Sequence, residues 1–206
     1  MHNRKILIIG EVYVDQHLDI IENGYSTSRL GGIFHAARSC DALNIEYALA
    51  YYAPDYLVKD VEKFGIDVLR ASSIFRLGKV DKAPNVMLIG QSDESGNQLY
   101  ENILGRQAEY VSMLPFMQVL DDFDPTDIII FPGRYGNAGI LSNLSNYEGK
   151  IHIDMNYDCD DILDLDTIKI QTVFLSTSST SFEEFFKEIS LSLIHISEPT
   201  RLLSIS

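Results

Sequence analysis

The sequence predicts an α/β fold in three layers, αβα, with a mostly parallel sheet and a small β-rich lid. Short and almost wholly apolar runs of strand length alternate along the chain with segments of helical periodicity. Strands without a polar face are buried on both sides, which is typical of a parallel sheet covered by helices. Two pairs of extended runs, each joined by turn-forming residues, interrupt this alternation and predict a separate β-rich lid.

The N-terminal half supplies the first strand, a hairpin and two helices. Residues 6–9 are apolar and lead to Gly10, as expected of a buried strand. Residues 12–29 contain Asn23-Gly24, a strong turn signal, and are expected to leave the main sheet as a hairpin. The remaining elements are a helix to about residue 43, a strand at 47–52, a helix at 54–64 that Gly65 ends as a C-terminal cap, and a strand at 73–77.

A second hairpin opens the C-terminal half. Its extended runs, 85–90 and 98–104, flank a turn rich in Asp, Ser, Gly and Asn. Helix and strand then alternate again: we expect helices at 114–120 and 138–144, and strands at 125–131, 150–154 and 172–175.

Composition excludes several classes of function. The chain has 206 residues, 46% of them hydrophobic, which suffices for one domain with a true core. The net charge of -14 argues against nucleic acid as a partner, because phosphates attract Lys and Arg. No apolar segment is long enough to cross a membrane, and two cysteines without a CxxC motif predict reduced thiols rather than a disulfide or metal site. We therefore expect a cytoplasmic protein without metal ligands of its own.

Two adjacent glycines, Gly31 and Gly32, directly precede the first predicted helix. Such pairs occur where the backbone takes unusual dihedrals or lets another group approach, and the first turn of a helix offers N–H groups to a ligand. Asp15, just past the first strand, carries a carboxylate that accepts hydrogen bonds from vicinal hydroxyls. We favour a polyol-binding corner over a solvated or helix-capping Asp15 and a simple glycine turn. His35 fits a hydroxyl contact and a half-exposed helical position equally well.

Other candidates come from their places at strand ends or on the second hairpin. Asn102 and its neighbour Glu101 point to opposite faces of a strand, so at most one of them faces a ligand, and both fit solvated positions. Arg134 follows an apolar strand, where open α/β sheets bind ligands. Asp154 and Asn156 end another strand and suit either a metal-phosphate region or a plain turn.

Taken in order, these features resemble the N-terminal two-thirds of a ribokinase-like (PfkB) carbohydrate kinase, over roughly residues 4–188. The matching features are Gly10 and then Asp15 after the first strand, the glycine pair followed by Ala37, the hairpin at 86–103, and Ile153-Asp-Met-Asn-Tyr157. The resemblance implies an ATP-dependent kinase of a sugar or similar small hydroxylated substrate. It also implies lid segments at about 12–30 and 85–104, and a homodimer formed through the lid.

On this resemblance, the site residues fall into two groups. The substrate-binding residues are Asp15, Gly31, Gly32, His35, Asn102 and Arg134. The cofactor-binding residues, for the ATP and Mg²⁺ that the intact parent protein uses, are Asp154, Asn156 and Ser178. We expect no cofactor on the chain by itself.

The chain also departs from the family pattern. The family's substrate-binding asparagine falls on His35, and a serine-rich run that includes Ser178 replaces its Asn-x-x-Glu segment. Serine is a poor ligand for magnesium. The Gly-Ala-Gly-Asp signature, which supplies the family's anion hole and catalytic aspartate, is absent from the 206 residues. We therefore expect a truncated ribokinase-like domain at 1–190 that contains no catalytic residue and is inactive.

The last residues have a separate explanation. Leu191-Ser-Leu-Ile-His-Ile-Ser-Glu-Pro-Thr-Arg201 resembles a translated sequencing adapter, so residues 191–206 are interpreted as an artefactual tail rather than part of the fold. A genuine short C-terminal segment is the alternative.

Two other functions stay open. One is a non-catalytic sugar-binding or dimerisation module of the same fold, to which the serine-rich run gives some weight. The other is a nucleotide-binding Rossmann domain of a different class, which is weakened because no GxGxxG motif follows Gly10.

Overall fold

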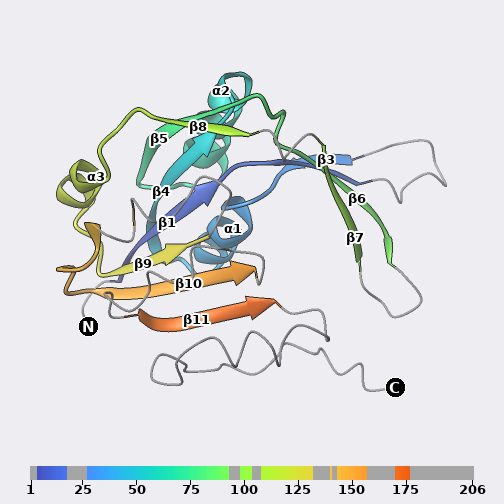
Figure 1. Cartoon of the computed structure of the whole chain (residues 1–206). Helices are drawn as coiled ribbons and strands as arrows, with labels where there is room; N and C mark the ends of the chain where they lie inside the picture. The colour runs from blue at the N-terminus through green and yellow to red at the C-terminus, as the bar shows by residue number, and fades with distance from the viewer. Residues whose placement is uncertain are drawn as a thin grey trace, which may run out of the picture.

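A computed structural model describes residues 4–17, 27–92, 98–103, 108–131, 140, 143–156 and 170–176. Within them it confirms the predicted α/β fold, with a main sheet covered by helices and a second sheet at one end (Figure 1). The elements, in chain order, are β1 (Lys5–Glu11), β2 (Val14–His17), β3 (Thr27–Leu30), α1 (Phe34–Ala42), β4 (Glu46–Ala53), η2 (Asp55–Leu57), α2 (Val58–Lys63), η3 (Phe64–Val68), β5 (Ser73–Asp81), β6 (Val86–Ser92), β7 (Gln98–Ile103), β8 (Glu109–Ser112), α3 (Phe116–Phe123), β9 (Asp127–Ile130), β10 (Lys150–Asn156) and β11 (Ile170–Ser176).

The main sheet contains seven strands among the described residues, in the order β11-β10-β9-β1-β4-β5-β8. All neighbouring pairs are parallel except β5 and β8, which are antiparallel. The sequence analysis did not predict β8. This edge strand is only four residues long and largely exposed, so it lacks the apolar run that marked the other strands.

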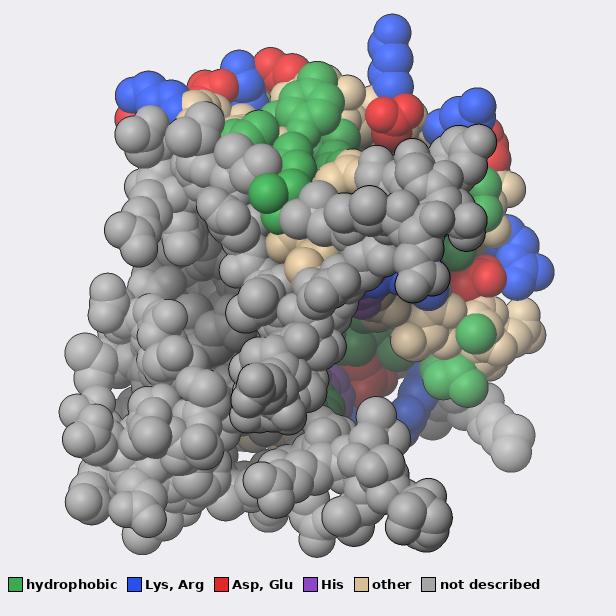
Figure 2. Space-filling model, turned by 90° about the vertical axis from the view of Figure 1, so that its right-hand side faces the viewer, with side chains coloured by type: hydrophobic (Ala, Val, Ile, Leu, Met, Phe, Trp, Pro, Cys, Tyr) green, Lys and Arg blue, Asp and Glu red, His purple; other side chains and the backbone are tan. Residues whose placement is uncertain are grey.

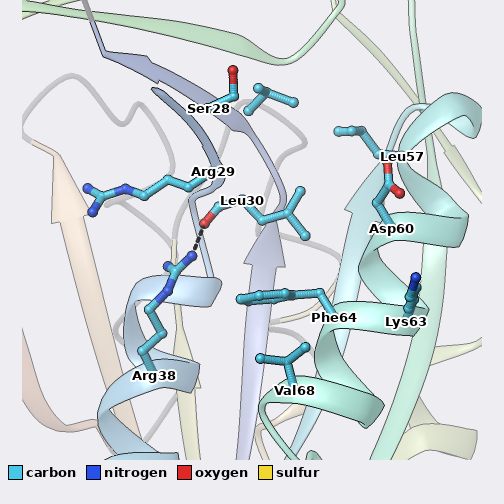
Figure 3. A pocket seen from close by; sticks show the side chains of 10 residues that line it. Ser28, Arg29, Leu30, Arg38, Leu57, Asp60, Lys63, Phe64 and Val68 are labelled. Atoms are coloured by element: carbon cyan, nitrogen blue, oxygen red, sulfur yellow. Dashed lines mark hydrogen bonds between the residues drawn. The ribbon is translucent and has the colours of Figure 1, made fainter. Parts of the chain in front are cut away.

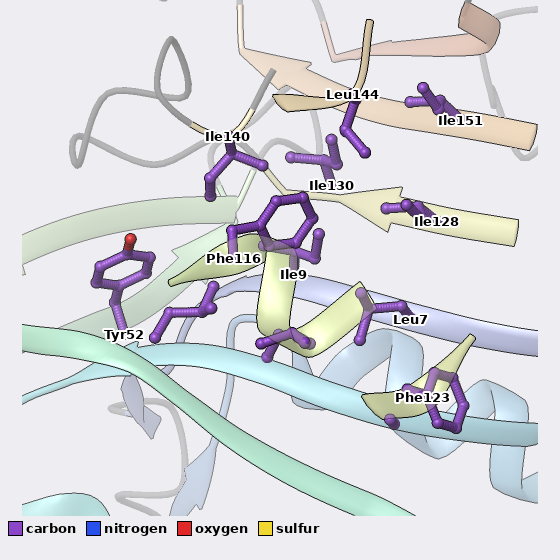
Figure 4. Packing of buried hydrophobic residues seen from close by; sticks show 14 of the residues in the cluster. Leu7, Ile9, Tyr52, Phe116, Phe123, Ile128, Ile130, Ile140, Leu144 and Ile151 are labelled. Carbon is purple, nitrogen blue, oxygen red and sulfur yellow. The ribbon is translucent and has the colours of Figure 1, made fainter. Parts of the chain in front are cut away.

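Two layers of buried side chains lie on opposite faces of this sheet, because successive residues of a strand point to opposite sides. On β1, Leu7 and Ile9 pack with Phe116 and Val119 of α3 on one face (Figure 4). Ile6 and Ile8 belong to the other layer, which includes residues of α1 and α2: Phe34, Ala37, Cys40 and Val61. The continuous apolar strands are therefore covered on both sides, as the three-layer prediction requires.

The second sheet, called the lid sheet below, has the strand order β3-β2-β6-β7. The pairs β2–β3 and β6–β7 are antiparallel, and the parallel pair β2–β6 joins them into one sheet. Strands β1, β9, β10 and β11 point toward this sheet (Figure 1). The lid sheet therefore lies beyond the carboxyl ends of the main strands, where α/β folds bind their ligands.

Gly65 does not end a helix, so that prediction is wrong. The chain continues through it in the π-helical turn η3, and Gly65 is buried without a positive φ. A Cβ on Gly65 would lie 2.5 Å from Cδ1 of Ile74, so the missing side chain serves close packing against β5. The predicted helix at 138–144 lies largely outside the described residues.

Across the part of the chain that the structure describes, no helix has the length and apolar character needed to cross a membrane.

Candidate functional site

Asp15 is a buried acid in the middle of the lid sheet. Only 4% of the residue is exposed, and β2 places it in register with Arg29 of β3 and Met87 of β6. Burying a carboxylate is costly unless charged or hydrogen-bonding groups surround it. Its position next to the glycine pair is the one that the sequence analysis predicted, so the structure brings the two together.

The two glycines serve different purposes. Gly31 leaves room for Asp15: a Cβ on Gly31 would overlap the carboxylate carbon and both carboxylate oxygens. Gly32 has a φ of 62°, which other residues rarely adopt, and a Cβ there would also overlap the carbonyl oxygen of Glu11. The pair therefore allows the lid strands, the end of β1 and the start of α1 to meet closely.

A histidine and an arginine lie next to the Asp15 carboxylate. Its Oδ2 lies 3.0 Å from Nε2 of His35 and 3.6 Å from Nε of Arg29, and both of these side chains are about half exposed. Figure 2 views the molecule from the side of the lid sheet and shows histidine, basic and acidic side chains together in a recess of this face. The site thus combines one carboxylate with hydrogen-bond donors that reach the surface.

Two buried polar atoms on one face of β2 lack a hydrogen-bond partner among the described residues. They are Oδ2 of Asp15, despite the nearby imidazole, and Nε2 of His17. Residues two apart on a strand point to the same side. Because buried polar groups are normally satisfied, a hydroxyl-bearing ligand on this face would complete both. His17 was not a predicted site residue.

The start of α1 does not offer the free amides that the sequence analysis expected. The amides of Ile33, Phe34 and His35 donate to the carbonyl oxygens of Glu11, Gly31 and Gly32, at 3.1, 3.3 and 3.1 Å. These three N–H groups are therefore occupied by the chain itself. The polar groups that this corner presents are therefore side chains rather than amides of the helix terminus.

The structure adds a buried hydrogen-bond network that the sequence analysis missed. Glu11, at the end of β1, is 4% exposed and accepts hydrogen bonds from Nδ2 of Asn85 at 3.1 Å and from the hydroxyl of Tyr110 at 2.9 Å. Asn85 also donates to the carbonyl of Val12 at 3.0 Å. A charged residue at the end of a buried strand was the available signal, and its partners are 74 and 99 residues away.

No described contact joins Asp15 to Asn102, Arg134, Asp154, Asn156 or Ser178. Only Asn102 is related to Asp15, through the strand register of the lid sheet. Asn102 of β7 is paired with Met87, which is itself paired with Asp15, so the three share one row across the lid sheet. Asp154 and Asn156 lie near the carboxyl end of β10, in register with Phe174 and Ser176 of β11. Arg134 and Ser178 lie outside the described residues.

Asp154 is the one predicted cofactor residue whose side chain is described. Burial raises the pKa of its carboxyl group, an effect that a bound cation would oppose. No group of three His, Cys, Asp or Glu residues within the described ranges is arranged to hold a metal ion. The described residues do not by themselves form a magnesium site.

No family model matches the sequence, and no curated protein is significantly similar to it. Solved structures share its fold. The microbiome-derived acarbose kinase Mak1 is 12% identical over 90% of this chain and 66% of its own, with a TM-score of 0.55. A protein from Enterococcus faecalis assigned as a 2-keto-3-deoxygluconate kinase is 14% identical over 90% and 62%, with a TM-score of 0.58. A fructokinase from Xylella fastidiosa, solved with ATP, is 10% identical over 74% and 52%, with a TM-score of 0.52.

These similarities show that the fold is ribokinase-like, as predicted. The chain spans between 52% and 66% of the length of these three proteins. At such low identity the likeness concerns the fold, and function has to be argued from the site.

Proposed function

We propose that this chain is the acceptor-binding part of an ATP-dependent kinase that phosphorylates a hydroxyl group of a sugar or similar small molecule. The observation that carries the proposal is the buried Asp15 carboxylate, packed on Gly31 beneath the lid sheet. A carboxylate held in this way is an acceptor for neighbouring hydroxyl groups. The ribokinase-like fold of sugar kinases supports the same reading.

The residues around Asp15 suit this role. Arg29 and His35 lie within ion-pair distance of Oδ2, and the two oxygens of the carboxylate leave acceptor capacity for a ligand. His17, on the same face of β2, extends the polar surface along the bound molecule, and Asn102 lies in the same row of the lid sheet as Asp15. The lid sheet would cover the acceptor and exclude water from it.

The donor side of the reaction belongs to the whole parent protein. ATP and Mg²⁺ would lie near the carboxyl ends of β9 to β11, with Asp154, Asn156 and Ser178 as their expected contacts. They supply the phosphoryl group and the positive charge that its transfer needs. The Gly-Ala-Gly-Asp segment is not in this sequence, so the chain contributes acceptor binding and not phosphoryl transfer. The setting we propose is cytoplasmic, with a homodimer formed through the lid sheet.

A non-catalytic sugar-binding or dimerisation module is the second candidate. The serine-rich run at 176–181, in place of an acidic metal-binding segment, favours it. A longer coding sequence of the parent that encodes the Gly-Ala-Gly-Asp signature would support the kinase, and one that continues the fold without it would support the module.

Acceptor binding is tested by isothermal titration of the purified chain with a panel of sugars, sugar acids and polyols. We expect at least one to bind, and Asp15→Asn to weaken it by about tenfold or more, since hydrogen bonds to charged groups contribute roughly 1.5–3 kcal/mol. Asp67→Asn, at an exposed position, is the matched control and should bind normally. Equal affinities of the two variants would remove Asp15 from the site.

A further inference from the structure

A cavity of about 430 Å³ lies between the strands β2 and β3 of the lid sheet and the helices α1 and α2 (Figure 3). Val14, Ser28 and Leu30 line it. These residues alternate with Asp15 and Arg29 along β2 and β3, so they face the opposite side of the sheet. The cavity thus lies mainly on the face of the lid sheet opposite Asp15 and adjoins the proposed acceptor site at Arg29, which lines the cavity and lies 3.6 Å from Asp15. Residues of α1, η2, α2 and η3 form its other walls.

The walls of this cavity are mainly apolar. Leu30 of β3 faces Phe64 across it, and Leu57 and Val68 extend the same surface (Figure 3). A volume of this size, with apolar walls and a few polar groups, is typical of a small-molecule site. The apolar surface would suit a flat hydrocarbon or aromatic body.

Its charged groups are mostly cationic. Arg38 of α1, Lys63 of α2 and Arg29 line it, against the single carboxylate of Asp60. This excess of positive charge stands out in a chain whose net charge is -14. Three cations against one anion favour a negatively charged ligand.

Arg38 gives the sharpest indication. Its Nη2 donates to the carbonyl oxygen of Leu30 at 2.7 Å, whereas its Nη1 is buried without a hydrogen-bond partner among the described residues. The guanidinium lies 5.6 Å from the ring centre of Phe64. Burial and the neighbouring Arg29 lower the pKa of Arg38, and the Asp15 carboxylate partly opposes this effect. An anion beside this guanidinium would satisfy its free donor and offset the repulsion between the two arginines.

We propose that this cavity binds a small organic anion, with a phosphate or carboxylate group at Arg38 and a flat apolar body between Leu30 and Phe64. The bidentate geometry of a guanidinium suits either head group. The ligand would bridge the lid sheet and the helices α1 and α2. This site goes beyond the proposed acceptor binding and does not depend on it.

The test is a titration of the full chain at low salt, followed by NMR chemical shifts, with three matched probes: 1-naphthyl phosphate, 1-naphthoate and uncharged 1-naphthol. We expect at least one anion to bind saturably and about tenfold more tightly than naphthol, as a charge-assisted contact predicts. Tighter binding of the phosphate or of the carboxylate probe then identifies the head group that the cavity prefers. Equal binding of all three probes, or none, would overturn the proposal.

Variants locate the anion. Arg38→Gln should lower the affinity for the preferred anion by about tenfold and leave naphthol unchanged. Should that variant fail to fold, Lys63→Gln, at an exposed position of α2, gives the test with a smaller loss of about threefold. Lys59→Gln, on the same helix but outside the cavity lining, is the control. Equal losses of anion affinity in Lys63→Gln and Lys59→Gln would contradict the assignment of the anion to this cavity. Unchanged anion binding in Asp15→Asn would show that the anion site is separate from the acceptor site.

Discussion

The carboxylate of Asp15 rests directly on the Cα of Gly31, with no room for a side chain between them. The glycine is required here for space and not for conformation, because among the described glycines only Gly32 has a positive φ. The Gly31 amide donates to the carbonyl of Tyr13 at 2.8 Å, which fixes the distance between the two strands of the hairpin. The acid and the glycine therefore form one structural unit.

Replacing Gly31 by Ala should displace the carboxylate. We expect the variant to lose acceptor binding and about 1–3 kcal/mol of stability, the usual cost of forcing a methyl group into a packed site. Urea unfolding and isothermal titration measure the two effects. Gly65→Ala is the control, because its methyl group would meet the flexible ends of Ile74 and Leu49, away from Asp15, and should leave acceptor binding intact. Normal binding by Gly31→Ala would show that Asp15 is not held as described.

Asp154, a half-buried acid near the carboxyl end of β10, provides a pH test. Because burial raises the pKa of Asp154 above 3.8, the folded protein binds this proton more tightly than the unfolded chain does. Stability is therefore lost as the pH rises through the folded pKa, and Asp154→Asn should be more stable than the wild type at pH 7. Below pH 3.8 the carboxyl group of Asp154 is uncharged in both the folded and the unfolded protein. The difference in stability between the wild type and Asp154→Asn should then vanish.

Urea unfolding between pH 3 and pH 7 measures this difference, with Asp67→Asn as the exposed control. A gain in stability at pH 7 would mark Asp154 as an acid kept at a cost to the fold, which is typical of functional positions. If the wild type were more stable than Asp154→Asn at pH 7, the predicted direction of the stability change would be wrong.

Local sequence patterns were sufficient for most of the main sheet and insufficient for the pairing of distant strands. Residues 6–9 and 128–130 are apolar throughout, so their burial in parallel strands followed from composition. The parallel pairing of β2 with β6, which builds the lid sheet, joins segments about 70 residues apart and leaves no local signature. Gly65 was misread because a glycine after a helix usually caps it, whereas here tertiary packing decides its role.

The site was predictable to a similar extent. Asp15, the glycine pair and His35 are close in sequence, so one strand and one helix start suffice to bring them together. Glu11 shares its network with Asn85 and Tyr110, and such contacts arise only once both sheets are assembled. The sequence indicates that a charged residue at position 11 is unusual, but it does not identify Asn85 and Tyr110 as the partners of Glu11.

Catalytic activity gives a further prediction. Phosphoryl transfer depends on positioned charge at the transferred group, and the sequence lacks the Gly-Ala-Gly-Asp segment expected to supply it. We expect the purified chain to release no ADP from ATP above background in the presence of Mg²⁺ and a bound acceptor. Turnover that is lost in Asp15→Asn would show that the chain carries its own phosphoryl-transfer groups.

Glu11 should control how the lid sheet is attached to the main sheet. Its carboxylate binds Asn85, directly before β6, and Tyr110 of β8, while its backbone carbonyl accepts from Ile33 before α1. Glu11→Ala removes an acceptor from the buried Asn85 side chain and from the half-buried Tyr110 hydroxyl, and a hydrogen bond to a charged group contributes roughly 1.5–3 kcal/mol. We expect faster hydrogen exchange in β6 and β7, with β9 at the centre of the main sheet unchanged.

Tyr110→Phe removes one of these two hydrogen bonds and should produce a smaller change of the same kind. Because exchange reports local opening separately from global unfolding, β6 and β9 in one experiment distinguish a positioning role from general stability. Equal acceleration in both strands would show that Glu11 only stabilises the whole fold. Acceleration confined to the lid strands, together with weaker acceptor binding, would show that Glu11 sets the position of Asp15 over the main sheet.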